Sequence, residues 1–276
     1  MKTIEFIGPS GIGKSTFLNE FAKYSQKNEI WMPFTTELKQ IKASQKNFLP
    51  RVIQKITPIK MGIKPKRAIK NYLFKKYEEE IDVFAELFFR NINNVSHLSS
   101  SEMIILTDYY FNTIILNLLI VLHNSSSRHT LVLDEGIIIN GLLAGTDINR
   151  RIKSKLSESA IFPSGVVYLN LDDASYKKRI SKRFKVWGEN RLNPVLKAVD
   201  EDRIDEYVSH LKAWSKKKLE LCRRLDLPVL EATANSTQSQ FEKLDDFIEM
   251  IHNFNHSNPE SFRDADRTQG GSPTLT

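Results

Sequence analysis

The sequence predicts an α/β fold, in which helices cover both faces of a doubly wound parallel sheet and a helical insertion follows the second strand. Short apolar runs alternate with helical segments along the chain, which is the pattern of β-α-β units. The runs Thr130–Asp134 and Val166–Leu171 are almost wholly apolar, as central parallel strands buried on both faces are. A length of 276 residues, 41% hydrophobic and 26% charged, suits one medium domain with an insertion and a tail.

Taken in order, the apolar runs predict five strands at Thr3–Ile7, Glu29–Phe34, Thr130–Asp134, Val166–Leu171 and Pro228–Glu231. Apolar residues at helical spacing predict the main helices at Ser15–Ser25, Tyr77–Val95, Met103–Leu122, Ser175–Lys185, Asp202–Leu225 and Phe241–Phe254. Several prolines interrupt the pattern between Leu38 and Lys76. We therefore expect one domain over 1–254 with a helical, basic insertion at 38–100, a flap at 172–200 and a disordered tail at 255–276.

The apolar segment Met103–Leu122 is long enough to raise the question of a membrane span. It contains Asp108, Asn112 and Asn117, and a charge near the middle of a span costs about 2.5–3.5 kcal/mol on insertion scales. A helix buried inside the domain explains the segment better. Met1 leads directly into a strand with no basic leader or cleavage site, so we expect a cytoplasmic protein. The single cysteine, Cys222, excludes a disulfide framework and a cysteine-rich zinc module.

The net charge of +7 favours an acidic partner, such as nucleotide phosphates, a phosphorylated metabolite, a nucleic acid or an anionic membrane. Lysines and arginines concentrate in residues 51–76. They can hold an anionic acceptor or a membrane surface, or they can be a solvated face. The sequence leaves these alternatives open.

The segment Gly8-Pro9-Ser10-Gly11-Ile12-Gly13-Lys14-Ser15 fits the P-loop pattern G-x-x-x-x-G-K-[ST] without a mismatch, between an apolar strand and an amphipathic helix. Glycines let successive backbone N–H groups point at a phosphate, and the start of the helix adds its free N–H groups. The lysine would bridge the β- and γ-phosphates, and the serine hydroxyl would be a Mg²⁺ ligand. The predicted nucleotide-binding residues here are Gly8, Pro9, Ser10, Gly11, Ile12, Gly13, Lys14, Ser15 and Thr16.

Two further stretches carry candidate catalytic residues. Asp134 ends a central strand and is a Walker B candidate that would hold Mg²⁺. Glu135 is either a base for a water or hydroxyl, or an acid at the start of the next helix. Arg179 and Arg183 share one helix face, and Arg191 follows in the segment Trp187–Arg191. These arginines either close over a triphosphate as a flap or belong to a solvated basic helix.

The order of these motifs resembles the nucleoside and nucleoside-monophosphate kinases, with thymidylate kinase and the deoxynucleoside kinases nearest by layout. The resemblance spans roughly residues 1–254, and the P-loop is its one strongly specific motif. It implies that Glu37, after the second strand, handles the acceptor and that the loop with Ala234 and Asn235 lies against the adenine. Where these kinases carry Asp-Arg or Glu-Arg, this chain has Asp134-Glu135. That difference argues against thymidylate as the acceptor.

The leading hypothesis is a kinase that uses Mg-ATP to phosphorylate a small-molecule, anionic acceptor, such as a nucleoside, nucleotide or sugar-like compound. The alternative is an ATPase in which Glu135 activates water. The chain has no transporter signature before Leu131 and no Asn-Lys-x-Asp motif, which weighs against transporter ATPases and GTPases. Aromatic and basic residues are not interleaved, so nucleic acid is not favoured as a partner. Homodimerisation is left open.

Overall fold

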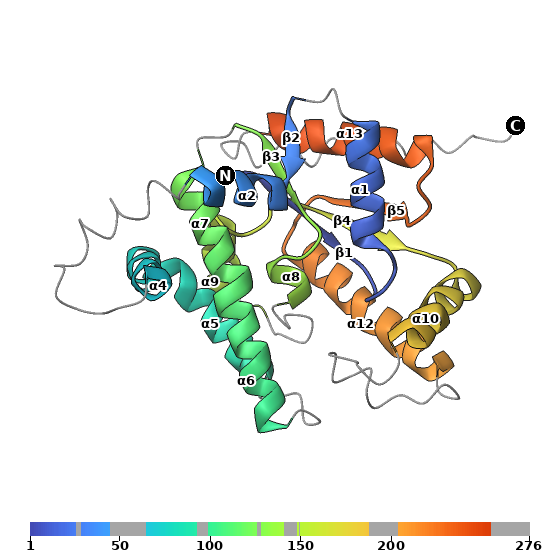
Figure 1. Ribbon diagram of the computed structural model, residues 1–276, viewed down its shortest axis with the longest axis horizontal. Helices are drawn as coiled ribbons and strands as arrows, with labels where there is room; N and C mark the ends of the chain where they lie inside the picture. The colour runs from blue at the N-terminus through green and yellow to red at the C-terminus, as the bar shows by residue number, and fades with distance from the viewer. Residues whose placement is uncertain are drawn as a thin grey trace, which may run out of the picture.

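A computed structural model of the chain describes residues 1–25, 29–44, 65–92, 99–125, 128–140, 148, 150–187 and 204–254. At its centre lies a five-stranded sheet in the order β2-β3-β1-β4-β5 (Figure 1). The strands are β1 (Thr3–Ile7), β2 (Trp31–Pro33), β3 (Thr130–Leu133), β4 (Gly165–Asn170) and β5 (Val229–Thr233). Every neighbouring pair is parallel, so all carboxyl ends meet at one edge. The predicted α/β class with a parallel sheet is confirmed.

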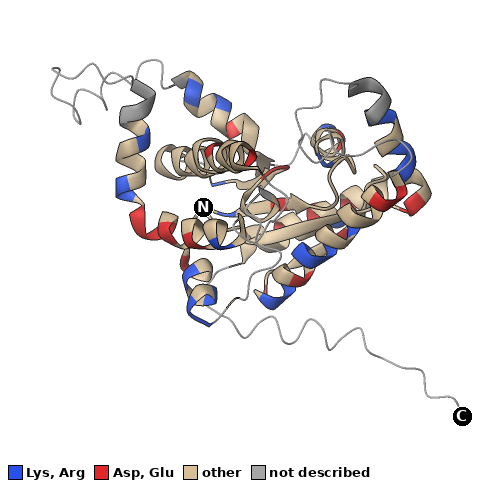
Figure 2. Ribbon diagram, turned by 90° about the horizontal axis from the view of Figure 1, so that it is seen from below, with Lys and Arg blue, Asp and Glu red and all other residues tan. Residues whose placement is uncertain are grey.

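Helices cover both faces of this sheet, an arrangement compatible with a three-layer α/β/α fold. In the described residues they are α1 (Lys14–Tyr24), α2 (Phe34–Ser44), α4 (Pro65–Lys76), α5 (Glu78–Ile92), α6 (Ser100–Tyr109), η1 (Tyr110–Ile115), α7 (Leu116–Asn124), α8 (Ile137–Asn140), α9 (Arg150–Glu158), α10 (Asp173–Trp187), α12 (Ile204–Arg224) and α13 (Gln238–Asn253). Charged residues lie mainly on these helices, and the strands between them are largely uncharged (Figure 2).

The strands are apolar because both of their faces are buried. On one face, Phe6 and Val167 pack with α1 and α13, where Phe17 meets Phe241 edge-on at 5.4 Å between ring centroids. On the other face, Leu131 belongs to a cluster with α2, α5, α7 and α9. Two separate cores thus hold the two helical layers to one sheet.

The longest apolar helix runs without interruption from Ser100 to Asn124 through α6, the π-helical η1 and α7. By length and composition it could cross a membrane, with a mean hydropathy of 1.7, and 39% of its most apolar stretch is buried. This is weak evidence, because core helices of soluble proteins pass the same test. No residue of α6 is buried, and Ile104 and Ile105 are 69% and 63% exposed. The expected burial therefore holds only for the second half of the helix.

Several predicted boundaries are corrected. The second strand is shorter than Glu29–Phe34, because Phe34 already begins α2. Pro33, which has no N–H to donate, ends this edge strand. After Leu38, where prolines loosen the sequence pattern, α2 continues to Ser44. The structure adds α8 and α9, which were not predicted. The tail 255–276, the flap segment 188–200 and most of the basic segment 51–76 lie outside the described residues.

Because the long helix is buried unevenly, substitutions in its two halves should change the free energy of unfolding by different amounts. Leu119 is fully buried in α7, so Leu119→Ala should lower the free energy of unfolding by about 2–5 kcal/mol through lost contacts and a cavity. Ile104→Ala, on the exposed half, should change it by less than about 0.5 kcal/mol. Urea unfolding followed by circular dichroism measures both. Equal losses would show that α6 is covered in solution.

Candidate functional site

The loop between β1 and α1 is built around three glycines. Gly8, Gly11 and Gly13 have φ of 143°, 82° and 104°, values that residues with a side chain rarely adopt. A hydrogen bond of 3.2 Å from the Ile12 N–H to the Pro9 carbonyl closes the turn. A Cβ on Gly8 would stand 2.5 Å from the Leu169 carbonyl oxygen of β4. The loop therefore follows a path that requires glycine, pressed against the neighbouring strand.

Lys14, the first residue of α1, turns its side chain back over this loop. Its Nζ donates to the carbonyl oxygens of Gly8, at 3.3 Å, and Pro9, at 3.4 Å. Burial lowers the pKa of Lys14 to about 8, although the nearby carboxylates of Glu135 and Asp134 act to raise it. An ammonium held in this way is close to the free N–H groups of the first turn of α1. The loop thus presents several donors and one cation to the same space.

Ser15 and Asp134 meet beside this loop. The Ser15 hydroxyl donates to Oδ2 of Asp134 over 2.7 Å. The contact follows from the topology, because β1 and β3 are neighbours with Glu5 opposite Leu133. No cluster of three or more His, Cys, Asp or Glu residues that could hold a metal by itself occurs in the described part of the chain. A hydroxyl and a carboxylate oxygen are nevertheless ligands that suit Mg²⁺ when substrate phosphates complete the shell.

Glu135 is exposed at the same edge and has a partner that the sequence did not reveal. The hydroxyl of Tyr109, at the end of α6, donates to its carboxylate. Burial and this carboxylate raise the pKa of Tyr109 above its usual value. Nothing in the sequence linked the two residues, because the contact depends on how the long helix packs against the turn after β3.

Helix α10 carries the predicted arginines against the loop. The Arg179 guanidinium donates to the Ile12 carbonyl and, over 3.2 Å, to the Ala234 carbonyl. A Cβ on Gly11 would lie 2.9 Å from a guanidinium nitrogen of Arg183. Tyr176, which was not predicted, donates from its hydroxyl to the Ser10 carbonyl over 2.6 Å. One face of α10 thus follows the loop; Arg191 lies outside the described residues.

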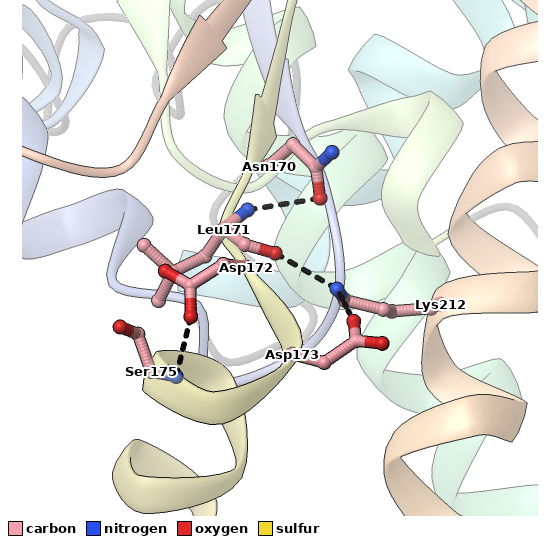
Figure 3. A network of polar contacts seen from close by, with 6 residues as sticks. All are labelled: Asn170, Leu171, Asp172, Asp173, Ser175 and Lys212. Carbon is pink, nitrogen blue, oxygen red and sulfur yellow. Dashed lines mark hydrogen bonds and ion pairs between the residues drawn. The ribbon is translucent and has the colours of Figure 1, made fainter.

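The start of α10 is fixed by polar contacts at the carboxyl end of β4 (Figure 3). The Ser175 N–H donates to the Asp172 carboxylate over 2.8 Å, which lowers the pKa of Asp172. From α12, Lys212 donates to the Leu171 carbonyl, at 2.8 Å, and to the Asp173 carboxylate. These contacts tie α10 both to the sheet and to α12. The arginines are therefore presented by an anchored helix.

A cavity of about 850 Å³ opens beside the loop, between the start of α1, the arginines of α10 and the loop after β5. This is within the size range of small-molecule sites. Its lining includes the predicted residues Gly11, Gly13, Thr16, Arg179, Arg183, Ala234 and Asn235. It also includes Phe17, Glu20, Lys182, Ser236 and Thr237, which were not predicted.

Glu37 has a hydrogen-bond partner outside the loop and the cavity. Glu37 is buried in the first turn of α2, and its carboxylate accepts a hydrogen bond of 2.5 Å from the Ser125 hydroxyl. Ser125 follows the last residue of α7, and Glu37 is not among the residues that line the cavity. Glu37 therefore ties α2 to the end of α7, because a buried carboxylate needs such a partner.

Comparison with protein-family models finds no family that matches this chain. Comparison with curated proteins finds no significant match either.

The close approach of Gly8 to β4 predicts that a residue with a side chain at this position would destabilise the fold. In Gly8→Ala, backbone strain alone should lower the free energy of unfolding by about 1–3 kcal/mol, and the collision with Leu169 adds to this. Ser10→Ala, at an exposed position of the same loop, should change it by less than about 0.5 kcal/mol. Thermal and urea unfolding measure both variants. Equal stability of the two would contradict the described path of the loop.

Proposed function

We propose that this chain binds a nucleoside triphosphate with Mg²⁺ and transfers its γ-phosphoryl group to a small-molecule acceptor. The observation that carries the proposal is the arrangement of Lys14, Ser15 and Asp134 at a loop that only glycines can form. Backbone N–H groups of the loop would bind the β-phosphate, and Lys14 would bridge the β- and γ-phosphates. Ser15 and Asp134 would hold Mg²⁺, which neutralises phosphate charge when bound.

The cavity beside the loop supplies a place for the nucleoside. It lies on the side of Thr16, Ala234 and Asn235, next to the space where the loop would hold phosphates. The resemblance to nucleoside kinases assigns the loop with Ala234 and Asn235 to the adenine. The cavity is consistent with that assignment, and we propose ATP as the donor.

The arginines of α10 support transfer of the phosphoryl group. Arg179 and Arg183 lie against Gly13 and Gly11, where their charge can meet the negative oxygens of the triphosphate. In the transfer, an acceptor oxygen bonds to the γ-phosphorus as the bond to the β-phosphate oxygen breaks. ADP leaves, and the acceptor proton passes to a base. Glu135, exposed and oriented by Tyr109, is our candidate for that base.

The position of Glu135 also favours one alternative. An exposed carboxylate beside Asp134 can activate a water molecule, which would make the chain an ATPase. The two functions differ in one measurement. ATP consumption that rises with one member of a panel of nucleosides, nucleotides and sugars, with a phosphorylated product seen by ³¹P NMR, establishes the kinase. Consumption that no acceptor changes, with free phosphate as the product, establishes the ATPase.

Lys14 and Asp134 test the nucleotide site. Lys14→Ala should reduce Mg-ATP turnover at least about a hundredfold, because it removes the cation that meets the transferring phosphoryl. Asp134→Asn should reduce Mg²⁺-dependent turnover far more than Mg²⁺-free nucleotide binding. Steady-state kinetics and binding of a fluorescent ATP analogue measure the two effects. Lys23→Ala, at an exposed position in the last turn of α1, is the control and should behave like the wild type.

Arg183 tests the role of α10. Arg183→Ala should lower kcat much more than it raises KM for ATP, because charge on the γ-phosphoryl is greatest in the transition state. A full arginine finger is worth about 10³–10⁵ in rate, so even part of that effect is measurable. Lys178→Ala, exposed on the same helix, should leave both constants unchanged. If the two variants behave alike, Arg183 takes no part in phosphoryl transfer.

A further inference from the structure

A carboxylate lies buried in the central strand, directly beneath the proposed site. Glu5 is 1% exposed in β1, among apolar neighbours on the same strand. Burial raises its pKa to about 7, against the lowering effect of two backbone N–H groups, Lys218 and Lys14. A buried ionisable group is costly to keep and persists where its contacts hold something in place. What Glu5 holds is the chain that follows Asp134 and Glu135.

Both carboxylate oxygens of Glu5 accept hydrogen bonds from the start of α8. The Ile138 N–H donates to Oε2 over 3.0 Å, and the Ile139 N–H donates to Oε1 over 2.6 Å. Gly136 lies against the same carboxylate, so close that a Cβ there would stand 2.5 Å from the Glu5 carboxyl carbon. The glycine after Asp134-Glu135 is therefore needed for the carboxylate to reach α8.

A buried lysine completes this arrangement from the other side. Lys218 of α12 is 6% exposed, and its Nζ donates to the Ile139 carbonyl. The pKa of Lys218 is lowered to about 8, mainly by burial and also by the charge of Lys14, while Glu5 acts to raise it. Glu5 and Lys218 thus hold the N–H and C=O groups of one short helix. Also near Glu5 are the Tyr110 hydroxyl, for which the described residues supply no partner, and the Cys222 thiol.

We propose that Glu5 is a positioning residue for the catalytic carboxylates, an inference that rests on the proposed function. Asp134 and Glu135 lie between two fixed points, strand β3 before them and helix α8 after them. The first point is held by the sheet and the second by Glu5 with Lys218. When it is ionised, Glu5 also attracts Lys14, more weakly than Glu135 and Asp134 do. One side chain of the central strand therefore helps to fix the turn that carries the two carboxylates.

The test separates positioning from stability with a double variant. Glu5→Gln leaves Lys218 without its charge partner and offers α8 one acceptor oxygen in place of two, so it should lose both stability and turnover. Glu5→Gln with Lys218→Met removes the unpaired charge, and its melting temperature should return toward the wild-type value. Its turnover should stay low, because α8 then has one acceptor oxygen in place of two and has also lost the Lys218 donor.

The readouts are binding of a fluorescent ATP analogue, the kcat and KM for Mg-ATP, and the Mg²⁺ concentration for half-maximal turnover. In the double variant we expect nucleotide binding within about threefold of the wild type, kcat lowered at least about tenfold, and a higher Mg²⁺ requirement. Thr3→Val, at another buried polar position on the same face of β1, should keep the wild-type values.

Recovery of turnover together with stability in the double variant would overturn the inference and leave Glu5 with a purely structural role. Failure of the proposed function looks different, because the wild-type chain would then neither bind the analogue nor consume Mg-ATP. The wild-type measurement therefore distinguishes the two failures.

Discussion

The arrangement of this molecule depends on the position of β1 between β3 and β4. Because β1 pairs in parallel with both, the loop that leaves its carboxyl end lies between the turn after β3 and the start of α10. Ser15 can then reach Asp134, and Gly8 comes against the carbonyl of Leu169. Moving β1 to an edge of the sheet would remove one of these two neighbours. The order of the strands alone therefore places the loop, the turn after β3 and the start of α10 next to one another.

A second consequence concerns charge. The loop gathers cations, namely Lys14, Arg179 and Arg183, and the adjoining turns supply Asp134 and Glu135. Beneath this edge of the sheet lie two buried groups of opposite charge, Glu5 and Lys218, which influence each other electrostatically. Buried pairs of this kind contribute little net stability, because desolvation offsets their attraction. Their value here lies in fixing α8, and through it the orientation of the carboxylates that precede it.

The contacts of α10 explain why two arginines of this helix lie against the loop between β1 and α1. Tyr176 and Arg179 donate to carbonyls of the loop, and Arg179 also reaches the loop after β5. Lys212 ties the beginning of the helix to α12. The helix therefore joins three segments that are far apart in sequence, and it closes one side of the cavity.

The sequence by itself determined the α/β class and the parallel strands, and it named Ser15 and Asp134 as candidate Mg²⁺ ligands. These follow from local patterns: apolar runs of strand length, glycines at fixed spacing, and an acid at a strand end. It also indicated that Arg179 and Arg183 share a face, since helical spacing requires it. The role of the loop in nucleotide binding stays a prediction.

Only the tertiary structure decided which residues meet across the chain. Tyr109 reaches Glu135, Glu5 reaches the start of α8, and Glu37 accepts a hydrogen bond from Ser125. None of these contacts leaves a periodic or motif signal, because each joins elements whose packing is set by the two cores. A buried glutamate in a strand looks in the sequence like an interruption of an apolar run. Its partners become visible only when α8 and α12 are folded against β1.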